Sequence, residues 1–377
     1  MRVRCLRWSL SILSAPSHSS RVIDVGHFPW LKSVGPNRRN VQTNRVGMGA
    51  IALLSGIAMG LTNAPTNGWP LAWVAQVPLW LLLYHHAFSR PSVSFSTLPL
   101  LHALLWAMGY YGTTLIWITG LHPLTWMGIP WVASVAIALS CWAIVTLWGC
   151  LWSVMWAMGF TTLLRWLGHQ PGLFAMATRV LVGTALWCGL DTLWSQGILY
   201  WPTLALTQSP SNLWVLQLNQ LSGPITTTAL IVTINGLLAE CCHPLLPYPA
   251  PPSGVNRPTI GTPLRFPALI LALSLMAIAH LLGAWLYFRP PLPAATPGHD
   301  LAIGLIQGNI PSRIKLTRAG IQQAFDRYTQ GYDQLADQGA DLVVLPEGAI
   351  PLVWDGSKAG INAGGNPVAK RVGDRHI

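Results

Sequence analysis

Long apolar stretches recur along most of this chain, separated by short polar or proline-rich connections. Seven of them approach or exceed the roughly 20 residues that a helix needs to cross the hydrocarbon core of a membrane. They cover residues 47–63, 70–88, 98–118, 129–159, 179–199, 220–239 and 266–287. The second contains Pro78, which a helix inside a membrane bundle tolerates. The pattern predicts a polytopic α-helical membrane bundle of about seven spans over residues 47–288.

The distribution of charge supports this interpretation. The chain is 52% hydrophobic and 9% charged, whereas about a quarter of the residues of a soluble domain are charged. The formal net charge of +11 is concentrated before the first span and in alternate loops, so we expect no nucleic-acid partner. The loops at 63–70, 119–128 and 200–220 hold no Lys or Arg. Because basic loops stay in the cytoplasm, the segment after the seventh span is predicted on the outer face.

Residues 1–46 form a basic lead with eight Lys or Arg residues and one acid, Asp24. Two interpretations stay open: an Arg-rich transit peptide, or a stretch upstream of a translation start at Met48. We favour the start at Met48 and otherwise expect the lead to be disordered. Residues 289–300 contain four prolines and are predicted to be an extended linker.

A few polar residues within the membrane body are functional candidates. Asp191 lies in or near the fifth span, where an acid is costly; it is either functional or an interfacial residue capped by Thr192 or water. The uncharged 200–220 loop could guide a lipid or be an ordinary interfacial loop. His85 and His86 are adjacent and point to different helix faces, so we expect an interfacial pair. The cysteine and histidine spacings predict no metal site and no cofactor.

Beyond the linker the pattern changes to that of a water-soluble α/β domain. Residues 301–310 and 341–347 have the apolar character of strands, and 318–339 have helical periodicity. We predict a βαβ unit whose second strand is buried on both faces. Glu347 follows that strand between Pro346 and Gly348, at the edge of the sheet where α/β proteins bind ligands. It is a candidate general base, although a solvated acid at a strand end would look the same.

Several motifs carry a resemblance to a known family. They are IQGNIP and PEGAIP at the two strand ends, GYYGTTLIWI at 109–118, LYWPTLALTQSPSNLWVLQLNQLSG at 199–223 and TINGLLAE at 233–240. In this order and spacing they resemble the apolipoprotein N-acyltransferases, from about Met48 to about Trp354. The resemblance implies that residues 301–355 begin an α/β nitrilase-like domain, an αββα sandwich of the carbon–nitrogen hydrolase type. Residues 356–377 would be an irregular tail.

The resemblance also implies an activity. Members of the family sit in the bacterial inner membrane with the nitrilase-like domain on the periplasmic side. They transfer an acyl chain from a phospholipid to the diacylglyceryl-cysteine amine of an apolipoprotein. A Glu–Lys–Cys triad works through a thioester, and Glu347 matches the triad glutamate as general base.

The chain departs from the family pattern after PEGAIP. No cysteine follows Cys242, and Lys358 and Lys370 lie in a glycine-rich tail without a strand pattern. We therefore expect this chain to lack the triad lysine and cysteine and to be inactive alone. The alternative function is a non-catalytic polytopic membrane protein that binds lipid or a partner. A transporter would need more charged or broken helices.

Overall fold

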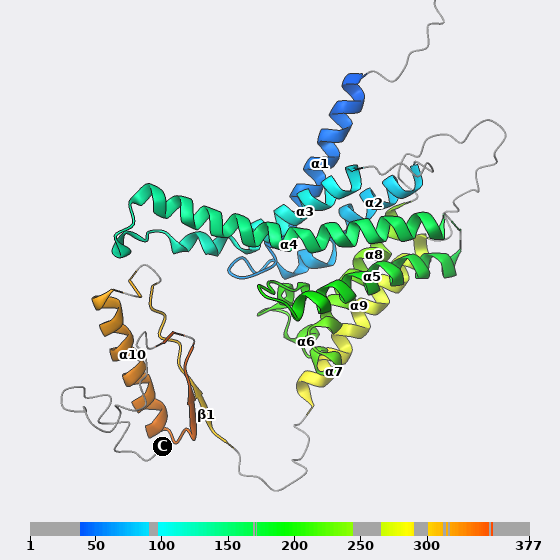
Figure 1. Ribbon diagram of the computed structural model, residues 1–377. Helices are drawn as coiled ribbons and strands as arrows, with labels where there is room; N and C mark the ends of the chain where they lie inside the picture. The colour runs from blue at the N-terminus through cyan, green and yellow to red at the C-terminus, as the bar shows by residue number, and fades with distance from the viewer. Residues whose placement is uncertain are drawn as a thin grey trace, which may run out of the picture. The chain divides into compact units, whose positions relative to one another are not determined.

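The computed structural model describes residues 38–89, 97–168, 170, 172–243, 265–289, 301–311, 314–315, 317–346 and 348–349 (Figure 1). Side chains are not described at 38–44, 89 and 265. The chain divides into two compact units, Met1–Arg45 and Val46–Ile377, and almost all of the described residues belong to the second unit. The predicted Pro-rich linker falls almost entirely outside the described residues, as does the predicted tail.

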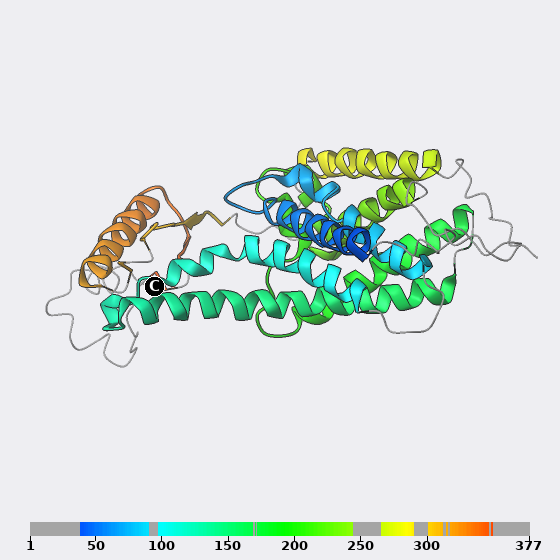
Figure 2. The same ribbon diagram turned by 90° about the horizontal axis from the view of Figure 1, so that it is seen from above.

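Before residue 290, the described residues form helices joined by turns and loops, and no strand is found among them. The α-helices are α1 (Arg38–Gly60), α2 (Val77–Ser89), α3 (Leu98–Thr114), α4 (Trp131–Leu167), α5 (Leu173–Ser195), α6 (Leu213–Leu216), α7 (Asn219–Ser222), α8 (Ile225–Cys242) and α9 (Arg265–Phe288). The 3-10 helices are η1 (Trp69–Trp73), η2 (Ile116–Leu121), η3 (Thr125–Met127) and η4 (Leu204–Gln208). In both ribbon views α3 runs beside α4, and α9 runs beside α8 (Figures 1 and 2).

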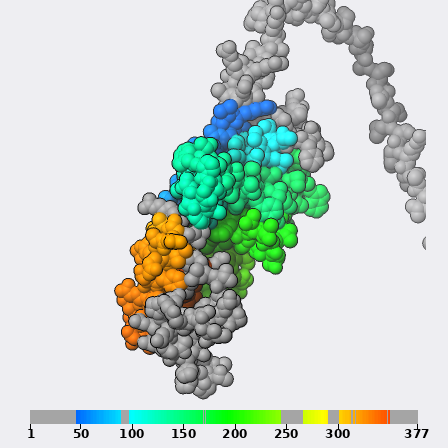
Figure 3. Space-filling view, turned by 60° about the vertical axis from the view of Figure 1, so that its left-hand side comes forward, coloured from blue at the N-terminus to red at the C-terminus, as the bar shows by residue number. Residues whose placement is uncertain are grey.

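Within the described ranges, four helices are long and apolar enough to cross a membrane: α4, α5, α8 and the Phe266–Phe288 part of α9. These helices fit the predicted membrane body, while the total of seven spans stays a prediction. At 37 residues, α4 is roughly 55 Å long and exceeds the hydrocarbon thickness of about 30 Å. Exposed apolar side chains gather where it begins: Met127, Trp131 and Val132. Figure 3 shows this teal part of the chain on the face toward the viewer.

The second predicted span is broken. Instead of a continuous helix over 70–88, η1 ends at Trp73, a turn comes next, and α2 begins at Val77 with Pro78 in its first turn. Proline fits there because the first helical N–H groups have no partner within the helix. The buried Asn235 of α8 closes the break: it accepts the Gln76 N–H at 2.9 Å and donates to the Ala72 carbonyl at 2.8 Å.

Close backbone contact joins α1 to α3. A Cβ atom on Gly56 would lie 1.9 Å from the carbonyl oxygen of Trp106, and one on Gly109 would lie 2.5 Å from that of Leu53. Small residues at such positions let membrane helices approach closely. Large aromatic side chains fill the interior of the bundle. For example, Trp80 packs edge-on against Phe160 with ring centroids 4.7 Å apart.

The second part of the chain is the βαβ unit that the pattern predicted. Strands β1 (Ile303–Leu305) and β2 (Leu342–Val344) pair in parallel, with α10 (Arg318–Asp337) between them in sequence. The Thr317 hydroxyl caps α10 by accepting the Gly320 N–H at 3.2 Å. The nitrilase-like sandwich itself stays a prediction.

The expected burial of the second strand on both faces is wrong for the described part of the chain. Leu342 and Val344 are 50% and 42% exposed. The reason is that α10 covers the opposite face, where its Leu335 lies against Gly304. Successive side chains of a strand point to opposite faces, so Leu342 and Val344 point away from α10.

Candidate functional site

The candidate base Glu347 lies outside the described residues, but the residues on both sides of it are described. The Ala349 N–H donates to the Pro346 carbonyl at 3.0 Å, so the chain turns tightly directly after β2. Gly348 has φ +65°, a left-handed conformation that favours glycine. Ala349 is buried against α10 with Ala324 and Tyr328. The predicted sharp turn at Gly348 is therefore present at the carboxyl end of β2.

A lysine that the sequence reasoning missed lies at this turn. A Cβ atom on Gly348 would be only 3.2 Å from the Nζ atom of Lys315, which is half-buried. Lys315 is held in a turn in which its N–H donates to the Pro311 carbonyl at 3.1 Å. The two lysines weighed from sequence, Lys358 and Lys370, lie outside the described residues. The available signal for Lys315 was its place after β1, because the carboxyl ends of neighbouring parallel strands share one edge.

Gly308 and Asn309, which follow β1, are held in place by α10. Arg327 donates from Nη1 to the carbonyls of Gly308 at 2.7 Å and Asn309 at 3.1 Å. The Tyr328 ring lies directly against Gly308, leaving no room for a side chain there. Asn309 has φ +48°, which asparagine tolerates. This edge of the sheet therefore has two turns, and the Nζ atom of Lys315 in one turn lies beside Gly348 in the other.

Asp191 is buried at the end of α5, with 8% of its surface exposed. Its Oδ2 atom accepts from the Thr203 hydroxyl at 3.0 Å and from the Tyr200 hydroxyl at 3.4 Å. Thr203 also contacts the hydroxyl of Thr228 on α8 at 3.0 Å. The expected cap by Thr192 is thus replaced by partners from the following loop. Asp191 fastens that loop to α5, which gives it a structural role here.

The 200–220 loop is only partly superficial. Gln208 is fully buried and accepts from Asn212 at 2.9 Å. Trp201 and Trp214 are about half exposed, and the Trp201 ring lies 5.3 Å from that of Trp117. An interfacial aromatic loop and a lipid-guiding loop both fit this arrangement.

A buried ion pair lies nearer to the beginning of α5 than Asp191 does. Arg179 makes two contacts with Glu240 of α8: Nε to Oε1 at 2.7 Å and Nη2 to Oε2 at 2.9 Å. Tyr84 of α2 donates to the same carboxylate at 2.9 Å, and Arg179 also donates to the Gln170 carbonyl at 3.0 Å. Sequence reasoning did not predict the pair. A signal existed, since Asp191 and Glu240 are the only acids in residues 47–288.

Of the two adjacent histidines, His86 contacts a third histidine on a neighbouring helix. His86 lies with its Nε2 atom 2.9 Å from Nδ1 of the buried His102, and the two rings are stacked. The pairing of His86 with His102 on α3 was not foreseen. Among the described side chains, no group of three or more His, Cys, Asp or Glu residues is placed to hold a metal.

The sequence of this chain is similar to the sequences of known proteins. Residues 55–237 match the family model described as the apolipoprotein N-acyltransferase N-terminal domain. Three proteins named apolipoprotein N-acyltransferase are similar to this chain. The one from Nostoc sp. is 41% identical over 78% of this chain and 53% of its own length, and the one from Synechocystis sp. is 39% identical over 79% and 56%. The one from Thermosynechococcus vestitus is 36% identical over 87% and 55%. The chain spans about half the length of these curated relatives.

Proposed function

Because this chain belongs to the apolipoprotein N-acyltransferase family, we propose that it takes part in the N-acylation of lipoproteins in the bacterial inner membrane. The acyl donor would be a membrane phospholipid, and the acceptor the diacylglyceryl-cysteine amine of an apolipoprotein. The membrane body, 47–288, would hold both lipids. The βαβ unit, as the start of a nitrilase-like domain on the periplasmic side, would present the catalytic base.

We assign the role of general base to Glu347. In the proposed reaction it takes the proton of a cysteine thiol, and the thiolate attacks the ester carbonyl of the phospholipid. Glu347 returns this proton to the departing alkoxide oxygen, so that a lysophospholipid leaves and a thioester remains. The amine of the acceptor then attacks the thioester, the carboxylate takes the proton that the amine loses, and this proton passes to the cysteine thiolate that leaves. We expect no match for the triad lysine and cysteine among these 377 residues, so we propose the reaction for the acyltransferase as a whole.

The observation that carries this proposal is the anchored edge of the sheet at residues 346–349. A tight turn with a left-handed glycine directly after a parallel strand suits a carboxylate presented to a ligand. The positively charged side chain of Lys315 lies beside Gly348, the residue that follows Glu347. An opposite charge nearby favours the ionised form of a carboxyl group, which is the form that a general base needs.

A chimera tests the proposal. Residues 48–355 of this chain would be joined to the remaining portion of the Nostoc relative, and membranes containing the chimera would be assayed for acylation of a diacylglyceryl lipopeptide. We expect acylation by the chimera and a loss of at least about a hundredfold in Glu347→Gln, a scale typical of removing a general base. Asp337→Asn is the matched control, since Asp337 is an exposed acid of α10, and it should leave the rate unchanged.

The 377-residue chain should be assayed in parallel, and we expect it to trap no thioester. An active Glu347→Gln chimera would remove Glu347 from the mechanism. An inactive chimera that still retains phospholipid through purification would instead support the non-catalytic lipid-binding alternative.

A further inference from the structure

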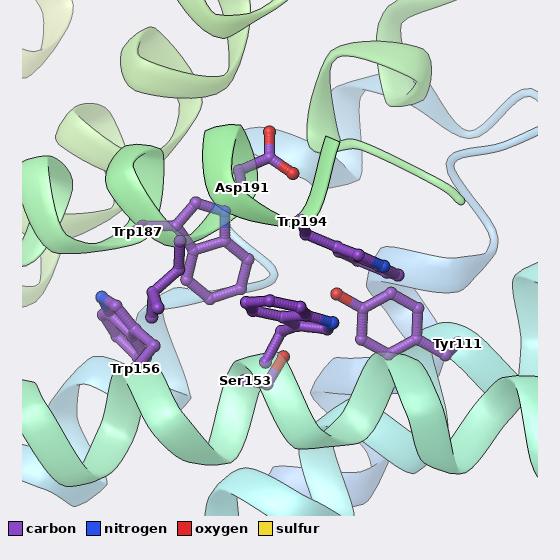
Figure 4. A pocket seen from close by; sticks show the side chains of 8 residues that line it. Tyr111, Ser153, Trp156, Trp187, Asp191 and Trp194 are labelled. Atoms are coloured by element: carbon purple, nitrogen blue, oxygen red, sulfur yellow. The ribbon is translucent and has the colours of Figure 1, made fainter. Parts of the chain in front are cut away.

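A small cavity lies inside the helical bundle where α3, α4 and α5 meet. Its walls include Tyr111 of α3, Trp152 and Ser153 of α4, and Asp191 and Trp194 of α5 (Figure 4). Its volume of about 20 Å³ is enough for one water-sized group. Trp152 and Leu190, which line it, are only half-buried, so the cavity is not sealed from the surroundings of the bundle.

Three hydrogen-bond donors at this cavity have no partner of good hydrogen-bond geometry among the residues that the structure describes, although the Tyr111 hydroxyl lies close enough to Ser153 to interact with it. They are the Ser153 hydroxyl and the indole N–H groups of Trp152 and Trp194. Ser153 and Trp194 are 1% and 2% exposed, so bulk water does not satisfy them. Figure 4 shows the Tyr111 hydroxyl directed into the same space, below the ring of Trp194.

Some other indoles of the bundle have carbonyl acceptors, whereas those of Trp73, Trp80 and Trp148, away from this cavity, have no partner among the described residues. Trp156 donates to the Gly183 carbonyl at 2.9 Å, and Trp142 donates to that of Gly112 at 2.9 Å. Buried donors in folded proteins are almost always paired with protein groups or with ordered water. The gathering of unpaired donors around one cavity therefore indicates a bound group that supplies the acceptor.

The chemistry of the walls defines that group. An indole N–H can only donate, so the group must accept hydrogen bonds. The Asp191 carboxylate at the rim would repel an anion such as phosphate, and its Oδ2 atom is already held by Thr203. The volume admits one oxygen atom rather than a whole headgroup.

We propose that this cavity binds a single uncharged acceptor oxygen, shared by Ser153 and Trp194, that bridges α4 to α5 beside Asp191. Such an oxygen can come from an internal water molecule or from the ester carbonyl of a phospholipid that reaches between the helices. The bridge links the long helix α4 to the end of α5 from which the 200–220 loop departs. The proposal stands independently of the acyl-transfer reaction.

Unfolding of the full chain in lipid bicelles tests the shared oxygen. Ser153→Ala and Trp194→Phe should each raise the unfolding equilibrium constant about tenfold, and the double variant about tenfold rather than a hundredfold, because both donors lose the same partner. Ser153→Ala combined with Trp142→Phe is the control pair and should be additive, since Trp142 has its own acceptor. Additivity in both pairs would overturn the proposal.

Ultraviolet resonance Raman spectra of the folded chain, taken as wild type minus Trp194→Phe, report the hydrogen bond of the Trp194 indole. We expect the signal of a bonded N–H in bilayers of ester-linked dioleoyl phosphatidylcholine. If the acceptor is water, the signal persists in bilayers of the ether-linked analogue, which has no carbonyl. If the acceptor is a lipid carbonyl, the ether-linked bilayer gives the signal of a free N–H. A free N–H in both bilayers refutes the site, and Trp152→Phe serves as the second difference should Trp194→Phe fail to fold.

Discussion

Replacing Glu240 by leucine would leave Arg179 as a lone charge inside the helical bundle. The two side chains are 5% and 6% exposed and meet through two contacts, the shorter at 2.7 Å. At that distance their attraction is about 6 kcal/mol for an effective dielectric constant of about 20. Most of this attraction offsets the cost of taking both charges out of water, so the net contribution of the pair is much smaller.

Removing either charged side chain leaves the other charge buried without its partner. A buried charge left alone typically destabilises a protein by about 3–5 kcal/mol. We expect the upper part of this range for Glu240→Leu, because Tyr84 also loses its acceptor. Arg179→Leu should cost a similar amount. The double variant should be destabilised by about 1–3 kcal/mol relative to the wild type. This loss is smaller than that of either single variant, since no unpaired charge remains.

The measurement is unfolding in bicelles titrated with dodecyl sulfate and followed by far-ultraviolet circular dichroism. A double-mutant cycle gives the coupling between Arg179 and Glu240. Thr162→Leu is a control on the exposed face of α4, where a hydroxyl bonds only within its own helix; it should change stability by less than about 1 kcal/mol. If the double variant were as unstable as the two single variants added together, the reasoning from an unpaired buried charge would be refuted.

Two further predictions concern packing and pH. Gly56→Val should cost about 1–3 kcal/mol, because its Cβ would lie 1.9 Å from the Trp106 carbonyl oxygen, whereas Gly189→Val, in open space on α5, should cost clearly less; equal losses in the same unfolding assay would argue against the contact of α1 with α3. Burial raises the pKa of the Tyr200 hydroxyl to about 12, above the value of about 10 expected when unfolded, so the folded state keeps this proton longer and its stability falls as pH rises from about 10 to 12. Phenolate absorbance, taken as wild type minus Tyr200→Phe, should show this titration near pH 12, and a midpoint near 10 would contradict it.

Much of the architecture follows from the order of residues alone. Apolar runs of membrane length predicted the positions of the helices, because a helix in lipid must be apolar along its whole length. The change to strand and helix periodicity after residue 300 predicted β1, α10 and β2, since burial of one face imposes the period of each element. The PEGAIP motif pointed to Glu347 and to a sharp turn, and that turn is present at Gly348.

Other features depend on residues that meet only when the chain is folded. The helix break before Pro78 is bridged by Asn235, which lies more than 150 positions away in sequence. Asp191 accepts a hydrogen bond from Thr203 rather than from its neighbour Thr192. The same holds for the Arg179–Glu240 pair and for Lys315 beside Gly348. Local sequence determines which segments are helical or extended, because propensity and apolar periodicity act over a few residues. Tertiary packing decides the partners of buried polar groups. A polar group removed from water costs free energy unless it forms a hydrogen bond, so it pairs with any donor or acceptor within reach, however distant along the chain.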